Sequence, residues 1–300
     1  MRTEVSFPSN GLRLAGHLYR PQGAAPGPAI VVGHPGTGVK EQAAGLYARR
    51  LCELGFTALT FDAAFQGESE GQPRGLEDPA QRVEDVKAAV SFLCATDGID
   101  ARRIGALGIC ASGGYVMAAS AADHRIKAVA GVSAVDIGSQ FRRGADGHQD
   151  PAILNAMLDA AADARTRQAR GEPMGAFAVF PPDEAMARAG GPHLFEGWDY
   201  YCGGPAQHPR SAKTLTWDSV DRIATFDAFR FIDMIAPRPL LMIVGDDAVT
   251  KWMTTEAFER ARSPKTLYRV KDASHVALYH KDAEVGEAVT QLATFFGRAL

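Results

Sequence analysis

The sequence predicts an α/β protein with a central, mostly parallel sheet, flanked by helices and interrupted by one helical insertion. Three observations support this fold class. Short continuous apolar runs at 29–34, 57–61 and 126–132 are typical of strands buried on both faces. Segments with helical spacing alternate with these runs, which indicates a parallel sheet with right-handed crossovers. The alternation stops over 136–235, so we expect an inserted lid there and a core formed by 1–135 and 236–300.

Size and composition narrow the possible functions. Three hundred residues with 46% hydrophobic content suit one α/β domain with an insertion. There are 32 basic and 35 acidic residues and no basic block, so we expect neither nucleic acid nor a membrane surface as a partner. We find no apolar signal core and no run of about 18 apolar residues, and therefore expect a cytoplasmic protein. The four cysteines (Cys52, Cys94, Cys110, Cys202) form no C-x-x-C pair, which favours reduced thiols.

The first half of the chain follows the α/β pattern. Residues 4–7 and 12–19, separated by Pro-Ser-Asn-Gly, predict a β-hairpin. The buried run 29–34 ends in a tight turn of sequence Pro-Gly-Thr-Gly. The elements expected next are helix 41–54, strand 57–61, a loop with Gly67, Gly71 and Pro73, helix 77–95, strand 103–109, helix 112–122 and strand 126–132.

The second half begins with the insertion, which is rich in aromatic residues. Helical pieces are predicted at 151–170, 182–189 and 220–235. Most of the aromatic side chains should form a small core of their own, and a few should line an acyl pocket under the lid. The sheet resumes at 239–245, followed by helix 255–262, strand 266–270 and a final helix at 283–300.

One short stretch joins a buried strand to an Ala-rich helix through very small residues. Both Gly108-Ile-Cys110-Ala-Ser112 and Cys110-Ala-Ser112-Gly-Gly114 fit the pattern small-x-nucleophile-x-small of a nucleophile elbow. Gly108 favours Cys110 as the nucleophile, because it leaves the strand side free and lets the apolar run end at the apex. Ser112 is the alternative nucleophile, and a buried structural cysteine is the competing interpretation.

Reactive groups then follow in the order nucleophile, acid, histidine, with His275 in the loop before the last helix. This is the chain order of the α/β-hydrolase fold, and the sequence resembles that superfamily over nearly its full length. The Gly-x-Cys elbow resembles dienelactone hydrolases. Other motifs resemble a bacterial dienelactone-hydrolase-like branch related to fungal polyketide transferases, which use a Cys-His-Asp triad. These motifs are His34-Pro35-Gly36, Asp62-x-x-x-Gln66-Gly67-Glu68-Ser69 and Ala273-Ser274-His275-Val276-x-Leu278-Tyr279.

The resemblance implies a role for each residue. Cys110 would attack a carbonyl carbon, and His275 would take the thiol proton or pair with the thiolate. The amide of Ala111 would bind the oxyanion, together with an amide from the turn after His34, contributed by Gly36 or Thr37.

The acid is the least well defined member of the expected triad. Relatives place it three or four residues beyond the strand-ending glycine, where this chain has Ala248 and Val249. We expect Asp247 to be the acid, with Asp246 and Asp136 as alternatives. All three could instead be turn residues. A thiolate–imidazolium pair depends less on an orienting acid than a Ser-His pair does.

Other polar residues near these motifs have structural interpretations. We expect His34 to position the oxyanion turn, and Asp62 and Glu68 to fix loops by hydrogen bonds to backbone amides. Glu41 opens a helix, where an acidic side chain is favourable.

Three functions remain open from the sequence. The first is hydrolysis of a small-molecule ester, thioester or lactone through a Cys110 acyl-enzyme, and the second is transfer of the acyl group to an alcohol or amine. The third is a non-catalytic ligand-binding protein that keeps the fold. No cofactor is expected, and no metal, because the histidines lack ligand spacing such as H-E-x-x-H. A homodimer is left open.

Overall fold

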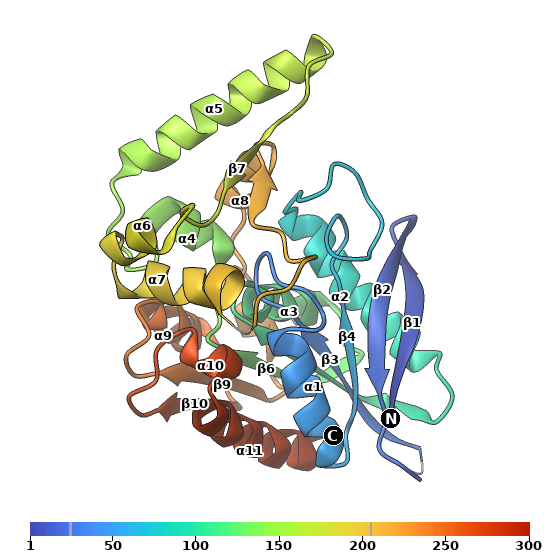
Figure 1. Cartoon of the computed structure of the whole chain (residues 1–300). Helices are drawn as coiled ribbons and strands as arrows, with labels where there is room; N and C mark the ends of the chain where they lie inside the picture. The colour runs from blue at the N-terminus through green and yellow to red at the C-terminus, as the bar shows by residue number, and fades with distance from the viewer. Residues whose placement is uncertain (24–25, 205) are drawn as a thin grey trace.

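A computed structural model describes residues 1–23, 26–204 and 206–300 (Figure 1). Its central sheet has the strand order β1-β2-β4-β3-β5-β6-β9-β10. The β1–β2 and β2–β4 pairs are antiparallel and the remaining pairs are parallel, which confirms the predicted mostly parallel sheet and its N-terminal hairpin. The strands are β1 (Arg2–Ser9), β2 (Leu12–Tyr19), β3 (Gly27–Gly33), β4 (Thr57–Phe61), β5 (Ile99–Ile109), β6 (Ile126–Val132), β9 (Leu240–Gly245) and β10 (Lys265–Val270).

Helices cover both faces of this sheet, so each face has its own apolar core. Alternate residues of β3 belong to different cores: Ala29 and Val31 lie in the core that includes side chains of α2, α3 and α9, whereas Ile30 and Val32 lie in the core that includes side chains of α1 and α11. This period of two is what a strand buried on both faces requires. The helices are α1 (Ala43–Glu53), α2 (Pro79–Cys94), α3 (Ala111–Ala122), α9 (Lys251–Arg260), α10 (Ala277–His280) and α11 (Asp282–Ala299).

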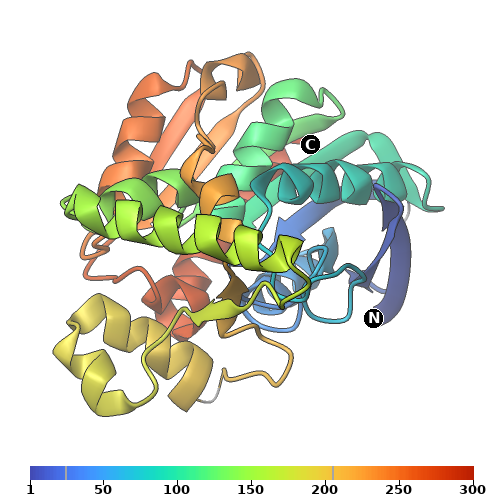
Figure 2. The same cartoon turned by 90° about the horizontal axis from the view of Figure 1, so that it is seen from above.

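Residues 136–235, called the inserted segment below, lie over one end of the sheet (Figure 1). Their longest helix, α5, crosses over the sheet in the view from above (Figure 2). The segment contains α4 (Ile137–Arg143), α5 (Pro151–Ala169), β7 (Ala176–Ala178), α6 (Glu184–Ala189), α7 (Pro192–Trp198), a π-helical turn (Asp199–Gly203), β8 (Thr214–Thr216), α8 (Ser219–Ala224) and a 3₁₀ helix (Ile232–Ile235). None of the helices in the described part of the chain has the length and apolar content needed to cross a membrane.

The continuous helix predicted over 220–235 is wrong. Helix α8 ends at Ala224, and the chain from 225 to 231 is not helical. Two backbone amides there bond to carboxylates instead of helical carbonyls: Ala228 donates to Asp136 and Phe229 to Asp227, each at 3.1 Å. Such side-chain bonds compete with the helix.

Candidate active site

Cys110 lies at the apex of the sharp turn between β5 and α3, with φ 56° and ψ −122°. A positive φ is unfavourable for a residue with a side chain and persists only where the surroundings impose it. Here the first turn of α3 packs closely against the end of β5. A Cβ at Gly108 would lie 2.0 Å from the carbonyl oxygen of Ser112, so only glycine fits. Cys110 is partly exposed, whereas Ile109 and Ala111 on either side are fully buried. The turn thus sets Cys110 apart from the fully buried residues on either side.

Ser112, the alternative nucleophile, has a different place. It lies in the first turn of α3 and is only 3% exposed. Its hydroxyl donates to the carbonyl of His34 at 2.5 Å and accepts from Arg82 at 3.4 Å. The Ser112 side chain therefore ties α3 to the end of β3, and Cys110 alone occupies the apex.

The backbone amides of Ala111 and Gly36 lie close enough to the sulfur of Cys110 to lower the pKa of its thiol. Gly36 belongs to the turn after β3, and a Cβ built on it would lie 3.8 Å from that of Ala111, so the turn and the elbow are in contact. Thr37, the other expected source, has φ 61°, and its carbonyl accepts a hydrogen bond from Ser211 at 2.9 Å. Paired amides in this position can stabilise an oxyanion formed on an acyl group bound to Cys110.

A buried polar network packs against the turn after β3. Nδ1 of His34 donates to the carbonyl of Pro35 at 2.7 Å, and its Nε2 accepts from the amide of Ala63 at 3.1 Å and from Arg82 at 3.0 Å. Arg82 also pairs with Glu77 at 3.2 Å. Burial, and then the cation of Arg82, lower the pKa of His34 well below its ordinary value, so the ring is neutral. These contacts agree with a positioning role for His34.

His275 lies in the loop between β10 and α10 and is 4% exposed. Its Nε2 is 2.8 Å from the hydroxyl of Tyr279, and its Nδ1 is 2.6 Å from the hydroxyl of Thr250. The hydroxyl of Ser133 donates to the His275 carbonyl at 3.2 Å, which holds the loop against β6. Burial, and then the neighbouring His193, lower the pKa of His275 to about 3. The imidazole is therefore neutral at physiological pH.

The hydroxyl of Tyr279 also lies close enough to the thiol of Cys110 to lower the pKa of the thiol, so it neighbours both the thiol and the imidazole of His275. Burial raises the pKa of the Cys110 thiol, although Tyr279 and the two amides oppose this rise. Burial, and then Cys110, raise the pKa of Tyr279 well above its ordinary value. In the resting site the thiol, the phenol and the imidazole are thus all neutral.

None of the three aspartates considered for the acid bonds to the His275 ring within the described residues. Asp247 is exposed and Asp246 pairs with Arg269 at 3.5 Å, because the turn after β9 directs both side chains away from the site. Asp136 caps α4 and accepts hydrogen bonds from Gly138, Ser139 and Ala228. The expected partner of His275 is corrected to Thr250, the residue before α9. A threonine at a helix start is too common for the sequence to have singled it out.

Aromatic side chains of the inserted segment surround the candidate site. The ring of His193, in α7, packs edge-on against His275 at 5.4 Å between centroids. The hydroxyl of Tyr201 donates to the carbonyl of Gly36 at 3.2 Å, and Phe180 stacks on Tyr201 at 5.0 Å. The sequence gives no indication of a role for His193, because no motif links it to His275.

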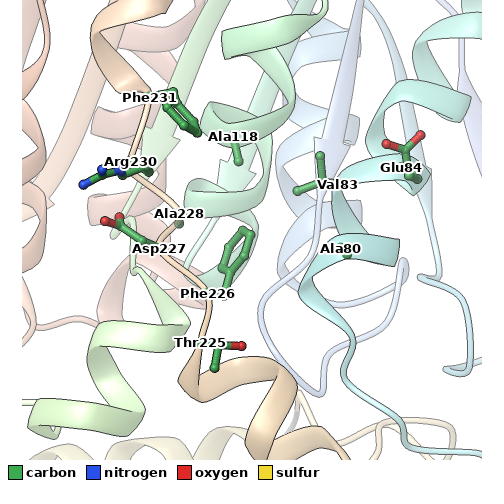
Figure 3. A pocket seen from close by; sticks show the side chains of 10 residues that line it. All are labelled: Ala80, Val83, Glu84, Ala118, Thr225, Phe226, Asp227, Ala228, Arg230 and Phe231. Carbon is green, nitrogen blue, oxygen red and sulfur yellow. The ribbon is translucent and has the colours of Figure 1, made fainter.

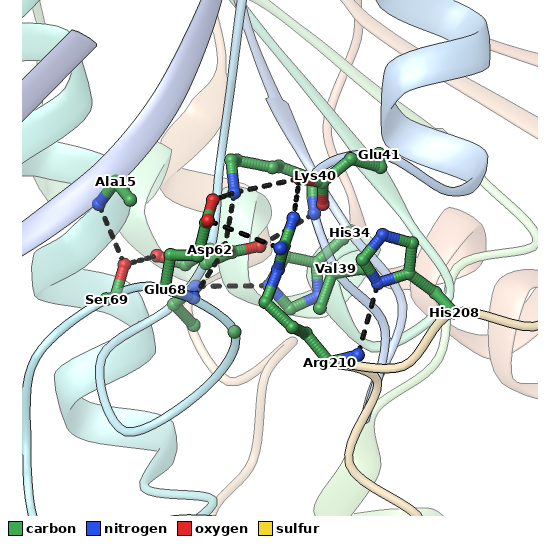
Figure 4. Close-up of polar contacts among 12 residues, drawn as sticks. Ala15, His34, Val39, Lys40, Glu41, Asp62, Glu68, Ser69, His208 and Arg210 are labelled. Atoms are coloured by element: carbon green, nitrogen blue, oxygen red, sulfur yellow. Dashed lines mark hydrogen bonds and ion pairs between the residues drawn. The ribbon is translucent and has the colours of Figure 1, made fainter. Parts of the chain in front are cut away.

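Ion pairs join the inserted segment to the residues that follow the turn after β3 (Figure 4). The buried ammonium of Lys40 is 2.8 Å from Asp62, 2.5 Å from Glu68 and 3.0 Å from Glu41. Burial alone would lower the pKa of Lys40, but Asp62 and the other two carboxylates outweigh it and raise the pKa. Arg210, from the inserted segment, then pairs with Glu41 at 2.7 Å and Glu68 at 3.3 Å. Asp62 also accepts from the amides of Lys40 and Glu68, in agreement with its expected loop-fixing role.

A cavity of about 620 Å³ lies away from these residues, between α2, α3 and the segment 225–231 (Figure 3). Ala118, Phe226 and Phe231 are among the residues that line it, and neither Cys110 nor His275 does. This cavity is therefore not the space into which an acyl group on Cys110 would extend.

Known proteins match nearly the whole chain. A model of the dienelactone hydrolase family matches residues 14–142. Uncharacterized protein YcjY of Escherichia coli (strain K12) is 40% identical over 275 residues, 91% of this chain and 89% of that protein. Thiohydrolase aneE of Aspergillus aculeatus is 28% identical over 296 residues (92% and 87%), and polyketide transferase claH of Penicillium crustosum is 28% identical over 273 residues (89% and 87%).

Solved structures extend this comparison. The crystal structure of hypothetical protein PA2218 from Pseudomonas aeruginosa has a TM-score of 0.90 and 31% identity, and the match covers 100% of this chain and 94% of that one. An α/β hydrolase, GrgF from a Penicillium species, has a TM-score of 0.84 at 22% identity, with 100% and 99% covered. The α/β-hydrolase fold implied by the sequence motifs is therefore confirmed.

Proposed function

Because this chain belongs to the dienelactone hydrolase family, we propose that it hydrolyses a small-molecule carboxylic ester, thioester or lactone through an acyl-enzyme on Cys110. The observation that best supports this proposal is the elbow itself, where Cys110 sits at the apex and the amides of Ala111 and Gly36 lie beside its sulfur. A buried structural cysteine would need neither the strained backbone nor the two amides.

The proposed reaction has two halves. The sulfur of Cys110 attacks the carbonyl carbon, its proton passes to His275, and the carbonyl oxygen becomes an oxyanion that accepts hydrogen bonds from Ala111 and Gly36. The intermediate expels the alcohol or thiol, which takes the proton back from His275. Water then attacks the acyl thioester with His275 as base, and the carboxylic acid leaves Cys110 restored.

In this proposal Thr250 orients the imidazole that an aspartate orients in a Cys-His-Asp triad. Its hydroxyl accepts from Nδ1–H of His275 at 2.6 Å and so leaves Nε2 free to receive a proton. A hydroxyl stabilises an imidazolium less than a carboxylate does, so proton transfer has to be coupled to attack on the substrate.

Acyl transfer is the second candidate, favoured by the enclosure of the site. Tyr201 of the inserted segment bonds to the oxyanion turn, and Tyr200 and Tyr201 are at most 5% exposed, so the segment has the contacts of a lid that excludes water. Polyketide transferase claH is a relative consistent with this chemistry. Product ratios measured with an added alcohol or amine competing against water distinguish transfer from hydrolysis.

Intact-protein mass spectrometry with a panel of activated esters and thioesters tests the proposal. We expect a mass increase equal to one acyl group on the wild type and on Ser112→Ala, and none on Cys110→Ala. An adduct on Cys110→Ala that disappears in Ser112→Ala would reject Cys110 as the nucleophile. Binding of these compounds without acylation of any variant would support the non-catalytic alternative.

A further inference from the structure

The hydroxyl of Tyr279 lies beside both groups that the proposed reaction has to couple. It lies 2.8 Å from Nε2 of His275, and it is close enough to the thiol of Cys110 to lower the pKa of the thiol. Among the described residues no hydrogen bond joins Cys110 directly to His275. The Tyr279 oxygen therefore offers a path for a proton that leaves the thiol for the imidazole.

Packing holds this hydroxyl in place. Tyr279 is 3% exposed, and its ring packs edge-on against the rings of His275 and Tyr200, each at 5.3 Å between centroids. It belongs to α10, the short helix that follows the His275 loop, and its amide donates to the carbonyl of Val276 at 2.9 Å. The spacing of four residues thus brings imidazole and phenol together on one turn of chain.

We infer that Tyr279 is a catalytic residue that relays the thiol proton of Cys110 to Nε2 of His275. This inference rests on the proposed function and adds to it the route of the proton.

The relay balances without any other reactant. The thiol proton moves to the Tyr279 oxygen as the phenolic proton moves to Nε2, so the S–H and O–H bonds break while new O–H and N–H bonds form. The sulfur keeps its electron pair and attacks the carbonyl carbon. Tyr279 ends neutral, and its hydroxyl has turned to donate to the sulfur. The leaving group then takes the proton from Nε2 of His275, and the Tyr279 hydroxyl turns back to donate to Nε2.

A neutral relay suits the electrostatics of the site. Burial keeps the phenol of Tyr279 protonated, so it exchanges one proton for another and never becomes a free phenolate. A purely structural tyrosine would need only one partner for its hydroxyl. Tyr47 is such a residue: it is fully buried and donates only to the carbonyl of Leu278, at 2.8 Å.

Tyr279→Phe tests the inference, with Tyr47→Phe as the matched control that also loses one buried hydroxyl. The first readout is alkylation of Cys110 by iodoacetamide as a function of pH, located by mass spectrometry, which requires no substrate. The second is kcat and KM for an activated ester. The third is the rate of wild-type acylation plotted against the fraction of D₂O in the solvent. This plot is curved when two protons move together. The measurement needs no variant, so it does not depend on whether a variant folds.

We expect Tyr279→Phe to slow alkylation at pH 7.5 about tenfold or more and kcat about 100-fold, with KM within threefold. Tyr47→Phe should leave the alkylation profile unchanged. The relay is rejected if Tyr279→Phe matches the wild type in both rates, if it reacts faster, or if the wild-type D₂O dependence is linear. Absence of ester turnover in the wild type would reject the proposed function instead, and the alkylation comparison would still decide the role of Tyr279.

Discussion

The hydroxyl of Thr250 lies 2.6 Å from Nδ1 of His275, which makes an uncharged group the polar partner of the buried imidazole. A carboxylate in this position would hold the ring and also stabilise its protonated form. The hydroxyl of Thr250 holds the ring but carries no charge to stabilise its protonated form. Together with burial and His193, this explains why the pKa of His275 falls to about 3 and why the thiol of Cys110 rests protonated.

Thr250→Asp should make the thiol of Cys110 more reactive. A carboxylate within 4–6 Å raises the pKa of a histidine by about 1–3 units, which stabilises the imidazolium and hence the thiolate. We expect iodoacetamide to alkylate Cys110 of this variant about tenfold or more faster at pH 7. Thr250→Asn, of similar shape but neutral, is the control and should stay within threefold of the wild type. Equal rates for the Asp and Asn variants would contradict this account.

The rate at which wild-type Cys110 is alkylated should rise with pH in a single alkaline transition. Because burial raises the pKa of the thiol, the thiolate fraction should grow about tenfold for each pH unit throughout the neutral range. No inflection is expected near pH 6.5, since His275 titrates near 3. Site-resolved mass spectrometry between pH 5 and 10 measures this and separates Cys110 from the other three cysteines. A plateau below pH 8 would mean instead that a thiolate–imidazolium pair exists at rest.

The folded protein should lose stability as the pH falls below about 6.5. His275 binds a proton near 6.5 when unfolded but only near 3 when folded, so between these values the unfolded state takes up more protons. At pH 5 the proton uptake of His275 in the unfolded state lowers the free energy of unfolding by about 2 kcal/mol. The buried His34, whose pKa is also lowered, adds to this loss. Urea unfolding at pH 7.5 and pH 5.0 measures the difference. The loss should be about 2 kcal/mol smaller in His275→Gln, and an identical loss would show that other groups cause it.

Gly108→Ala should disrupt the elbow. The new methyl group would lie 2.0 Å from the carbonyl oxygen of Ser112, and backbone cannot move aside as the end of a side chain can. We expect a loss of about 3 kcal/mol or more, or an insoluble protein. Gly286→Ala in α11 is the control: its Cβ would meet only the end of Arg50, at 3.5 Å, and alanine favours a helix by up to about 1 kcal/mol. Melting temperatures compare the two variants, and a stable Gly108→Ala would mean that α3 does not press on β5 as described.

The sequence by itself determined the fold and the position of the elbow, because both depend on local patterns. Continuous apolar runs mark strands buried on both faces, and the small residues from Gly108 to Gly114 mark a strand that turns abruptly into a helix. The resemblance also indicated Ala111, together with Gly36 or Thr37, as the sources of two amides, and the structure has the amides of Ala111 and Gly36 beside the sulfur.

Only the tertiary structure decided which side chains surround His275. Asp247 and Thr250 lie three positions apart on the same turn, and packing sends the first to solvent and the second onto the imidazole. His193 and Tyr279 reach the same ring from different elements, one of them in the inserted segment. Such contacts depend on how elements distant in sequence pack together, and side-chain direction at a turn depends on hydrogen bonds that residue patterns do not encode.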